Sequence, residues 1–381
     1  MRETSDQACQ LRLRDGVIKV QDLRIKKSSS LKDLPFFDPK AELGFGTHFT
    51  DHMFFCRYSE SKGWHDAEIG PYGSLQLDPA ASVLHYGQSL FEGMKAFRRG
   101  DGSIWLFRPQ FNWERMCKGA QRLTLPEPSQ EVYIEGLKKL LEIDQRWVPP
   151  LLGTSLYIRP TLIGSEAFLG LRPAKEAFFF IILSPVGFYY AEGNKLVKIW
   201  VEAKDVRASE GGLGSVKAGA NYAASLRASM IAKKRGYSQV LWLDSKHEGI
   251  EEVGTMNVFF VFDDEIVTPN LNGSILPGGV RDSVLQLLRN SGLAQGRMVS
   301  ERRITIQELT ERQAKGELRE AFGTGTAAVI SPIGEICGEH QSFVISHESG
   351  PVSTSLLETL QGIQWGSLKD DFGWMCPLEE L

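Results

Sequence analysis

Short apolar runs alternate along the chain with longer segments in which apolar residues recur every three or four positions. A short run bounded by turn residues is typical of a buried strand, and the longer spacing is typical of a helix with one buried face. We predict strands at 104–107, 155–159, 178–183, 196–201, 240–243 and 258–261. We predict helices at 111–123, after a cap at Ser129, from about 221 to Gly236, and from a cap at Asp282 to Leu288. This alternation predicts a mixed α/β fold.

Two segments interrupt the pattern and divide the chain. Residues 1–40 are polar and show few regular features, so we expect an N-terminal arm there. A proline and a glycine follow the apolar run that ends at 183, which makes 184–196 the expected interdomain linker. Because 381 residues exceed what one hydrophobic core usually organises, we predict two domains. The smaller, N-terminal domain would span 1–183, and the larger, C-terminal domain 197–381.

The composition disfavours several classes of protein. Charged residues make up 24% of the chain and the net charge is -4, so the basic excess of a nucleic-acid-binding protein is missing. The five cysteines are an odd number without a Cys-x-x-Cys pair, so neither a disulfide framework nor a metal site is expected. The polar first ten residues do not resemble a signal peptide, and the richest apolar run, 177–183, is too short to cross a bilayer. We therefore expect a cytoplasmic protein, or a mitochondrial one if the source is eukaryotic.

Lys217 is the first candidate for chemistry. It lies among small and apolar residues, where desolvation favours the neutral, nucleophilic form of the amine. Tyr222 follows at the start of a predicted helix and could reach the same group. Glu252 lies in a predicted turn between two apolar strands, and a carboxylate buried there needs a positive partner such as a protonated pyridinium. Taken singly, each residue has a commoner explanation: an exposed lysine, a packed tyrosine and a solvated turn glutamate.

Two glycine-rich segments could bind an anion. The segment 276–282 joins a loop to a predicted helix start, where free amides and the helix dipole favour a phosphate. The segment 322–327 adds a hydroxyl at Thr326; its weak likeness to a dinucleotide fingerprint fails because Pro332 would break the required helix. Arg115 could supply a charge-assisted contact to the same phosphate, although an arginine on a helix is more often exposed.

In their order and in their residues, these segments resemble the branched-chain amino-acid aminotransferases of the fold-type IV pyridoxal-phosphate enzymes. The resemblance covers most of the chain and is carried by 45–53, 84–86, 91–97, 157–160, 217–222, 252–257, 276–278 and 323–327. It implies a two-domain fold, mixed α/β or α+β, with pyridoxal 5'-phosphate between the domains. It also implies reversible, ping-pong transamination of L-leucine, L-isoleucine and L-valine with 2-oxoglutarate, which gives branched 2-oxo acids and L-glutamate.

The resemblance implies a role for each cofactor-binding position. Lys217 would form the Schiff base and then move a proton between the substrate's alpha carbon and the C4′ atom of the cofactor. Glu252 would pair with the ring nitrogen, and Tyr222 with the ring oxygen. The phosphate would be held by Arg115, by the amides of Gly279 and Val280, and by Thr326.

The resemblance also implies substrate positions. Thr255 and Ala327 match residues that meet the substrate carboxylate, and Arg159 would receive the distal carboxylate of glutamate. The apolar wall would be formed by Phe45, Tyr86, Phe91 and Tyr157. Aromatic walls with one arginine at the edge can accept both leucine and glutamate. Leu169 and Leu171 match a loop that reaches into the partner subunit's site, which implies a homodimer.

Three positions qualify this picture. The resemblance gives Lys95 no covalent role, so we interpret it as structural. Ala328 and Ser331 stand where animal members carry a redox-active cysteine pair, a departure that puts thiol-based regulation in doubt without touching catalysis. The alternatives to a branched-chain aminotransferase are a D-amino-acid aminotransferase, an aminodeoxychorismate-lyase-like enzyme and a non-catalytic pyridoxal-phosphate carrier or regulatory protein. The preference among the three branched substrates and the metabolic direction stay open at this point.

Overall fold

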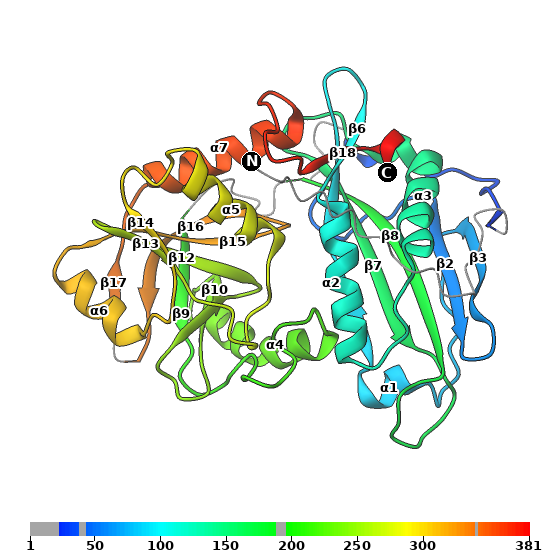
Figure 1. The fold of residues 1–381 in the computed structure, drawn as a ribbon, viewed down its shortest axis with the longest axis horizontal. Coiled ribbons are helices and arrows are strands. Elements are labelled where there is room, and N and C mark those ends of the chain that lie inside the picture. The colour runs from blue at the N-terminus through cyan, green and yellow to red at the C-terminus, as the bar shows by residue number, and fades with distance from the viewer. Residues whose placement is uncertain (1–22, 38–42, 188–195, 340–341) are drawn as a thin grey trace, which may run out of the picture.

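The structure is a computed structural model that describes residues 23–37, 43–187, 196–339 and 342–381. Its strands form two nine-stranded sheets, one in each half of the molecule (Figure 1). Helices cover the sheets and occupy the region between them (Figure 1). This arrangement confirms the predicted mixed α/β, two-domain class. None of the described helices is both long and apolar enough to cross a membrane.

The first sheet contains the N-terminal strands and one strand from the C-terminal end of the chain. Its order is β1-β3-β2-β8-β7-β5-β6-β18, with β4 paired to β7. The strands are β1 (Arg24–Ile25), β2 (His52–Ser59), β3 (Gly63–Pro71), β4 (Ser89–Phe91), β5 (Met94–Arg98), β6 (Ile104–Phe107), β7 (Ser155–Gly164), β8 (Glu176–Val186) and β18 (Met375–Pro377). The helices of this half are α1 (Ser82–Tyr86), α2 (Pro109–Arg122) and α3 (Gly136–Asp144), and a π-helical turn at Glu131–Glu135 leads into α3.

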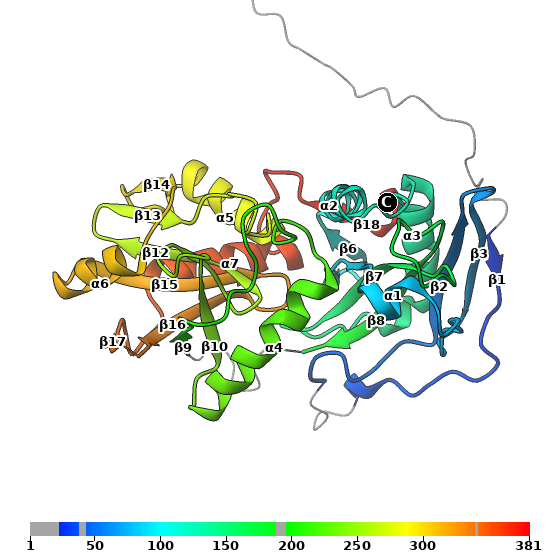
Figure 2. The same ribbon diagram turned by 90° about the horizontal axis from the view of Figure 1, so that it is seen from below.

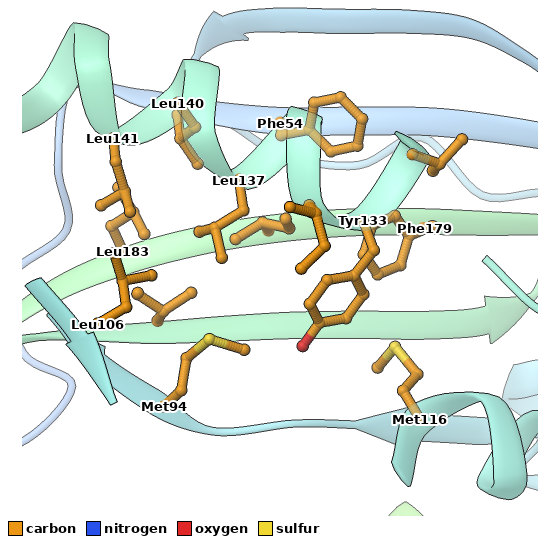
Figure 3. Close-up of a cluster of buried hydrophobic side chains, with 14 of the residues drawn as sticks. Phe54, Met94, Leu106, Met116, Tyr133, Leu137, Leu140, Leu141, Phe179 and Leu183 are labelled. Atoms are coloured by element: carbon orange, nitrogen blue, oxygen red, sulfur yellow. The ribbon is translucent and has the colours of Figure 1, made fainter. Parts of the chain in front are cut away.

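Helix α3 packs its apolar face onto the first sheet. Leu137, Leu140 and Leu141 are fully buried in the cluster that Figure 3 shows between this helix and the strands. A side-chain carbon at Gly136 would lie only 2.7 Å from the ring of Phe54, so glycine lets the helix approach the sheet closely. The Oγ atom of Ser129 accepts a hydrogen bond from Val132 N at 3.3 Å, which confirms the predicted cap.

The second sheet has the order β11-β10-β9-β16-β15-β12-β13-β14, and β17 pairs with β16. Its strands are β9 (Val197–Val201), β10 (Gln239–Leu243), β11 (Ile250–Val253), β12 (Met256–Phe262), β13 (Glu265–Thr268), β14 (Met298–Glu301), β15 (Leu318–Gly325), β16 (Val329–Cys337) and β17 (Ser342–Val344). The helices are α4 (Gly219–Lys234), α5 (Gly279–Asn290), α6 (Ile306–Ala314) and α7 (Pro351–Trp365). Helix α4 contacts both β10 of this sheet and β4 of the first, and Figure 2 shows it crossing between the two halves.

Helix α5 begins earlier than the sequence pattern indicated. Its cap residue is Gly278, so the prediction that Asp282 caps this helix is wrong. Asp282 lies in the first turn, where its carboxylate pairs with Arg108 at 2.6 Å. An acidic residue is favourable anywhere in the first turn of a helix, and this preference alone does not identify the cap.

Strand β8 also differs from the prediction, because it continues through Ser184 and Pro185 to Val186. At Pro185 the strand pairs only with β7, since its pairing with β2 has ended at Ile181. A proline is tolerated in a strand where its missing N–H would face no neighbour. Most of the expected linker, at 188–195, and most of the expected arm, at 1–22 and 38–40, lie outside the described residues.

Candidate active site

Lys217 lies where the two halves of the molecule meet. It lies two residues before the first residue of α4, and its carbonyl oxygen accepts a hydrogen bond at 3.1 Å from the amide of Phe91 at the end of β4. Its Nζ atom donates to the hydroxyl of Tyr222 at 2.6 Å and lies 5.0 Å from the centre of the Phe91 ring. The amine therefore faces a phenol oxygen and an aromatic ring. Of these two neighbours, the 217–222 segment predicted the phenol of Tyr222.

Glu252 lies in strand β11 and not in a turn, which corrects the sequence-based prediction. The strand pairs with β10 on one side and with β12 on the other, and it is buried along its whole length. A strand that carries two adjacent glutamates does not show the apolar alternation on which the prediction relied. The turn itself falls at Gly254, whose φ of 59° lies in the left-handed region.

The Glu252 carboxylate is held from several directions. Its Oε1 atom accepts hydrogen bonds from Leu276 N at 2.9 Å and from Asn257 Nδ2 at 3.2 Å. Its Oε2 atom lies 3.0 Å from Nε of Arg207, which is also buried. The sequence contained no indication of Arg207, because the arginine and the glutamate meet only through the fold.

The electrostatics link Glu252 to Lys217. Burial raises the pKa of the Glu252 carboxyl, while the Arg207 charge, the Leu276 amide and the Lys217 charge act in the opposite direction. The net pKa stays above its ordinary value. The Lys217 charge therefore acts through space on the Glu252 carboxyl.

An aromatic wall with one arginine borders Lys217. The ring of Phe45 meets the ring of Tyr157 edge-on at 4.8 Å, and the ring of Phe91 lies 4.8 Å from that of Tyr222. The guanidinium of Arg159 lies 4.7 Å from the Phe91 ring, and its Nη2 atom donates to the Tyr157 hydroxyl at 3.2 Å. Its Nε atom is buried and has no hydrogen-bond partner among the described residues. The structure thus brings together four of the predicted substrate residues.

A separate cavity collects the residues predicted to bind phosphate. It is lined by Gly93, Met94, Lys95, Phe107, Asn112, Arg115, Gly279, Val280, Thr326 and Gln364. Gly279 and Val280 open helix α5, so their amides have no acceptor within the helix. The Thr326 hydroxyl donates to the carbonyl of Gly93 at 3.2 Å. All four predicted phosphate residues therefore line one cavity.

Arg115 is fixed within this cavity by a partner that the sequence did not reveal. Its Nε and Nη2 atoms each lie 2.7 Å from an oxygen of Glu92, and both side chains are buried. Its Nη1 atom donates to the carbonyl of Pro277 at 2.9 Å, which ties α2 to the loop before α5. The guanidinium is thus oriented by two fixed acceptors.

The remaining predicted residues are less closely grouped. Asn257 lies opposite Thr324 in the pairing of β12 with β15, so Thr255 and the turn at 326–328 fall at the same end of these strands. Tyr86 donates a hydrogen bond to the carbonyl of Leu169, and this contact places it against the 165–175 loop. Leu169 and Leu171 are 62% and 82% exposed within the single chain, as residues that contact a partner subunit would be.

These groups fit pyridoxal 5'-phosphate. The cofactor needs an amine for its aldehyde, an anion near its ring nitrogen, a donor near its ring oxygen and amides for its phosphate. Lys217, Glu252 and Tyr222 would supply the first three, and the cavity at the start of α5 would supply the fourth.

Comparisons with known proteins agree with this geometry. Residues 89–336 match the family model described as amino-transferase class IV. The chain is 50% identical over 363 residues to branched-chain-amino-acid aminotransferase 2 of Bacillus subtilis, covering 95% of this chain and 98% of that protein. It is 46% identical to the branched-chain-amino-acid aminotransferase of Mycolicibacterium smegmatis, covering 89% of this chain and 93% of that protein.

Solved structures show the same fold. The branched-chain aminotransferase of Thermoproteus uzoniensis, solved with norvaline, superposes with a TM-score of 0.71 at 25% identity, covering 86% of this chain and 99% of that chain. The branched-chain amino acid aminotransferase of Escherichia coli gives a TM-score of 0.72 at 24% identity with the same coverage. The chain therefore belongs to the class IV aminotransferases, and within them to the family of the branched-chain-amino-acid aminotransferases.

Proposed function

We propose that this chain catalyses reversible, ping-pong transfer of the amino group between L-leucine, L-isoleucine or L-valine and 2-oxoglutarate, with pyridoxal 5'-phosphate as cofactor. The observation that carries the proposal is the position of the Lys217 amine, which lies 2.6 Å from the Tyr222 hydroxyl and 5.0 Å from the centre of the Phe91 ring. When bound, the cofactor supplies an aldehyde for the substrate amine and an electron-poor ring that stabilises the negative charge left by removal of the alpha proton.

Lys217 binds the cofactor and moves the proton. As the group that would hold the cofactor, the Nζ atom of Lys217 would move the proton between the substrate's alpha carbon and the C4′ atom of the cofactor. The Tyr222 hydroxyl, 2.6 Å from Nζ, orients the amine and donates to the ring oxygen. Glu252 would hold a proton at the ring nitrogen, and the hydrogen bond that it accepts from Leu276 N and its ion pair with Arg207 keep the carboxylate in place.

The phosphate and the substrate are bound by separate groups. Arg115, Thr326 and the amides of Gly279 and Val280 hold the phosphate in the cavity at the start of α5. Thr255 and the Ala327 amide bind the substrate carboxylate. Phe45, Phe91 and Tyr157, with Tyr86, exclude water from the side chain, and Arg159 receives the distal carboxylate of glutamate.

We further propose that the protein acts as a homodimer in the cytoplasm. The exposed Leu169 and Leu171 support the dimer, because apolar side chains 62% and 82% exposed on one loop are favoured at a subunit contact. Cys56, Cys117, Cys337 and Cys376 are all free, which fits a reducing compartment.

A turnover assay tests the proposal. We expect the protein with pyridoxal 5'-phosphate to convert leucine, isoleucine and valine with 2-oxoglutarate as acceptor, and to convert phenylalanine and D-alanine much more slowly. A Lys217→Ala variant is expected to lose turnover, whereas Lys118→Met, which changes an exposed lysine on α2, is expected to keep it. Turnover of D-alanine in preference to the three L-amino acids, or full activity of Lys217→Ala, would overturn the proposal.

A further inference from the structure

Lys95 is a buried amine in the cavity proposed to hold the phosphate. It lies in β5, is only 8% exposed and lines this cavity together with Arg115 and Thr326. Its Nζ atom donates to the carbonyl of Ala327 at 2.8 Å, across 232 positions of the chain. The bond joins the first sheet to the turn that carries Thr326 and the Ala327 amide.

The charge of Lys95 is unbalanced in the part of the chain that the structure describes. No carboxylate of the described residues forms an ion pair with it, whereas Arg115 in the same cavity is paired with Glu92 at 2.7 Å. Burial lowers the pKa of Lys95 to about 8, and no described group opposes this effect. An unpaired buried cation is costly unless an anion completes the site. Among the described residues that line the cavity, Lys95 therefore contributes a positive charge without a carboxylate partner.

The turn that Lys95 binds is strained. Val329, directly after 326–328, has a φ of 63°, in the left-handed region that β-branched residues avoid. Such a conformation persists only where surrounding contacts fix it. The bond from Lys95 to the Ala327 carbonyl is one of these contacts, and it also fixes the plane of the peptide that carries the Ala328 N–H.

We propose that Lys95 is a positioning residue of the active site, whose ammonium fixes the 326–328 turn through the Ala327 carbonyl and balances the charge of the cofactor's phosphate. The inference rests on the proposed function, because it requires pyridoxal 5'-phosphate in this cavity. It revises the sequence-based interpretation of Lys95 as merely structural. A purely structural lysine would support the turn equally well whether or not the bound aldehyde carries a phosphate.

Binding to the cofactor-free protein tests this difference. We compare pyridoxal 5'-phosphate with pyridoxal, which lacks the phosphate, for the wild-type protein, Lys95→Met and Lys95→Gln, and use Lys118→Met as the matched exposed control. We expect both Lys95 variants to bind pyridoxal 5'-phosphate about 10- to 100-fold more weakly, because one charge-assisted contact is lost. Their affinity for pyridoxal should change by less than about threefold. Lys118→Met should match the wild type with both ligands.

Inorganic phosphate provides a second measurement that does not depend on turnover. We expect it to raise the melting temperature of the cofactor-free wild-type protein more than that of Lys95→Met or Lys95→Gln. Unchanged affinity of both Lys95 variants for pyridoxal 5'-phosphate would overturn the proposal, and so would equal weakening with pyridoxal. A wild-type protein that binds neither aldehyde would instead overturn the proposed function itself, and the inference with it.

Discussion

Arg115 and Glu92 form a buried, bidentate ion pair in which two guanidinium nitrogens each lie 2.7 Å from a carboxylate oxygen. The geometry gives the arginine a fixed direction before any phosphate arrives. It also makes the pair vulnerable, because removal of one partner leaves the other charge buried and uncompensated.

We expect Glu92→Gln to lower the free energy of unfolding of the cofactor-free protein by about 3 kcal/mol, since Arg115 then lacks its counter-ion. The loss should be smaller with pyridoxal 5'-phosphate bound, because the phosphate supplies negative charge in the same cavity. Urea denaturation with and without the cofactor measures both values. Glu142→Gln, which removes the partially exposed pair with Lys139, should change stability by less than about 0.5 kcal/mol. Equal losses with and without the cofactor would contradict the prediction.

Arg207→Met is expected to shift the pH dependence of turnover. Burial raises the pKa of Glu252 and Arg207 opposes that rise, so the pKa increases further without the arginine. The reaction needs the ionised carboxylate, which is lost as the pH falls through this pKa. The acid limb of the kcat profile should therefore move to higher pH, with a loss on the order of tenfold at pH 7 and partial recovery at pH 9. Arg227→Met, at an exposed ion pair, is the control. An unmoved acid limb would show that Arg207 does not tune the carboxylate.

Arg159→Met should separate the two half-reactions. The guanidinium lies 4.7 Å from Phe91 and has a buried Nε atom that no described group satisfies, so it is available for a distal carboxylate. We expect the KM for 2-oxoglutarate to rise about 10- to 100-fold, because a charge-assisted contact is lost. Stopped-flow measurement of the leucine half-reaction should show a change of less than about threefold. Arg235→Met, at an exposed arginine, should alter neither value, and equal damage to both half-reactions would exclude this role for Arg159.

Glu320→Ala should destabilise the C-terminal half. The Glu320 carboxylate, on β15, accepts hydrogen bonds at 2.9 Å from the amides of Val352 and Ser353 in the first turn of α7. The variant is expected to lose about 2–3 kcal/mol of unfolding free energy, because buried amides and the helix dipole lose a charged acceptor. Chemical denaturation measures the loss. Glu358→Ala, exposed on the same helix, should stay within about 0.5 kcal/mol of the wild type, and a similar loss in both variants would count against the capping role.

Local sequence patterns were sufficient to predict much of the fold. Strand β6 matches the predicted range, and Ser129 caps its helix as expected, because both depend on neighbouring residues. The family and the two-domain class were confirmed. Errors arose where the pairing between strands overrides the preference of the local sequence. Strand β8 continues through Pro185 because the nitrogen of this proline, which carries no hydrogen, faces no strand.

The site was predictable only in part, for a related reason. The contact of Lys217 with Tyr222 spans five positions, so a short motif contains it. The contacts of Lys95 with Ala327 and of Arg207 with Glu252 join segments that are far apart in the chain. No local pattern encodes such pairs. Their discovery needs the register of the strands and the burial of the charges.

The course of the last strand, β18, has a consequence for biosynthesis. Met375 to Pro377 complete the first sheet beside β6, although all other strands of that sheet precede residue 187. During translation, strand β6 therefore has an unpaired edge until the whole second sheet has left the ribosome. A chain that stops before residue 375 would keep this edge unpaired and offer it to other chains as an aggregation site.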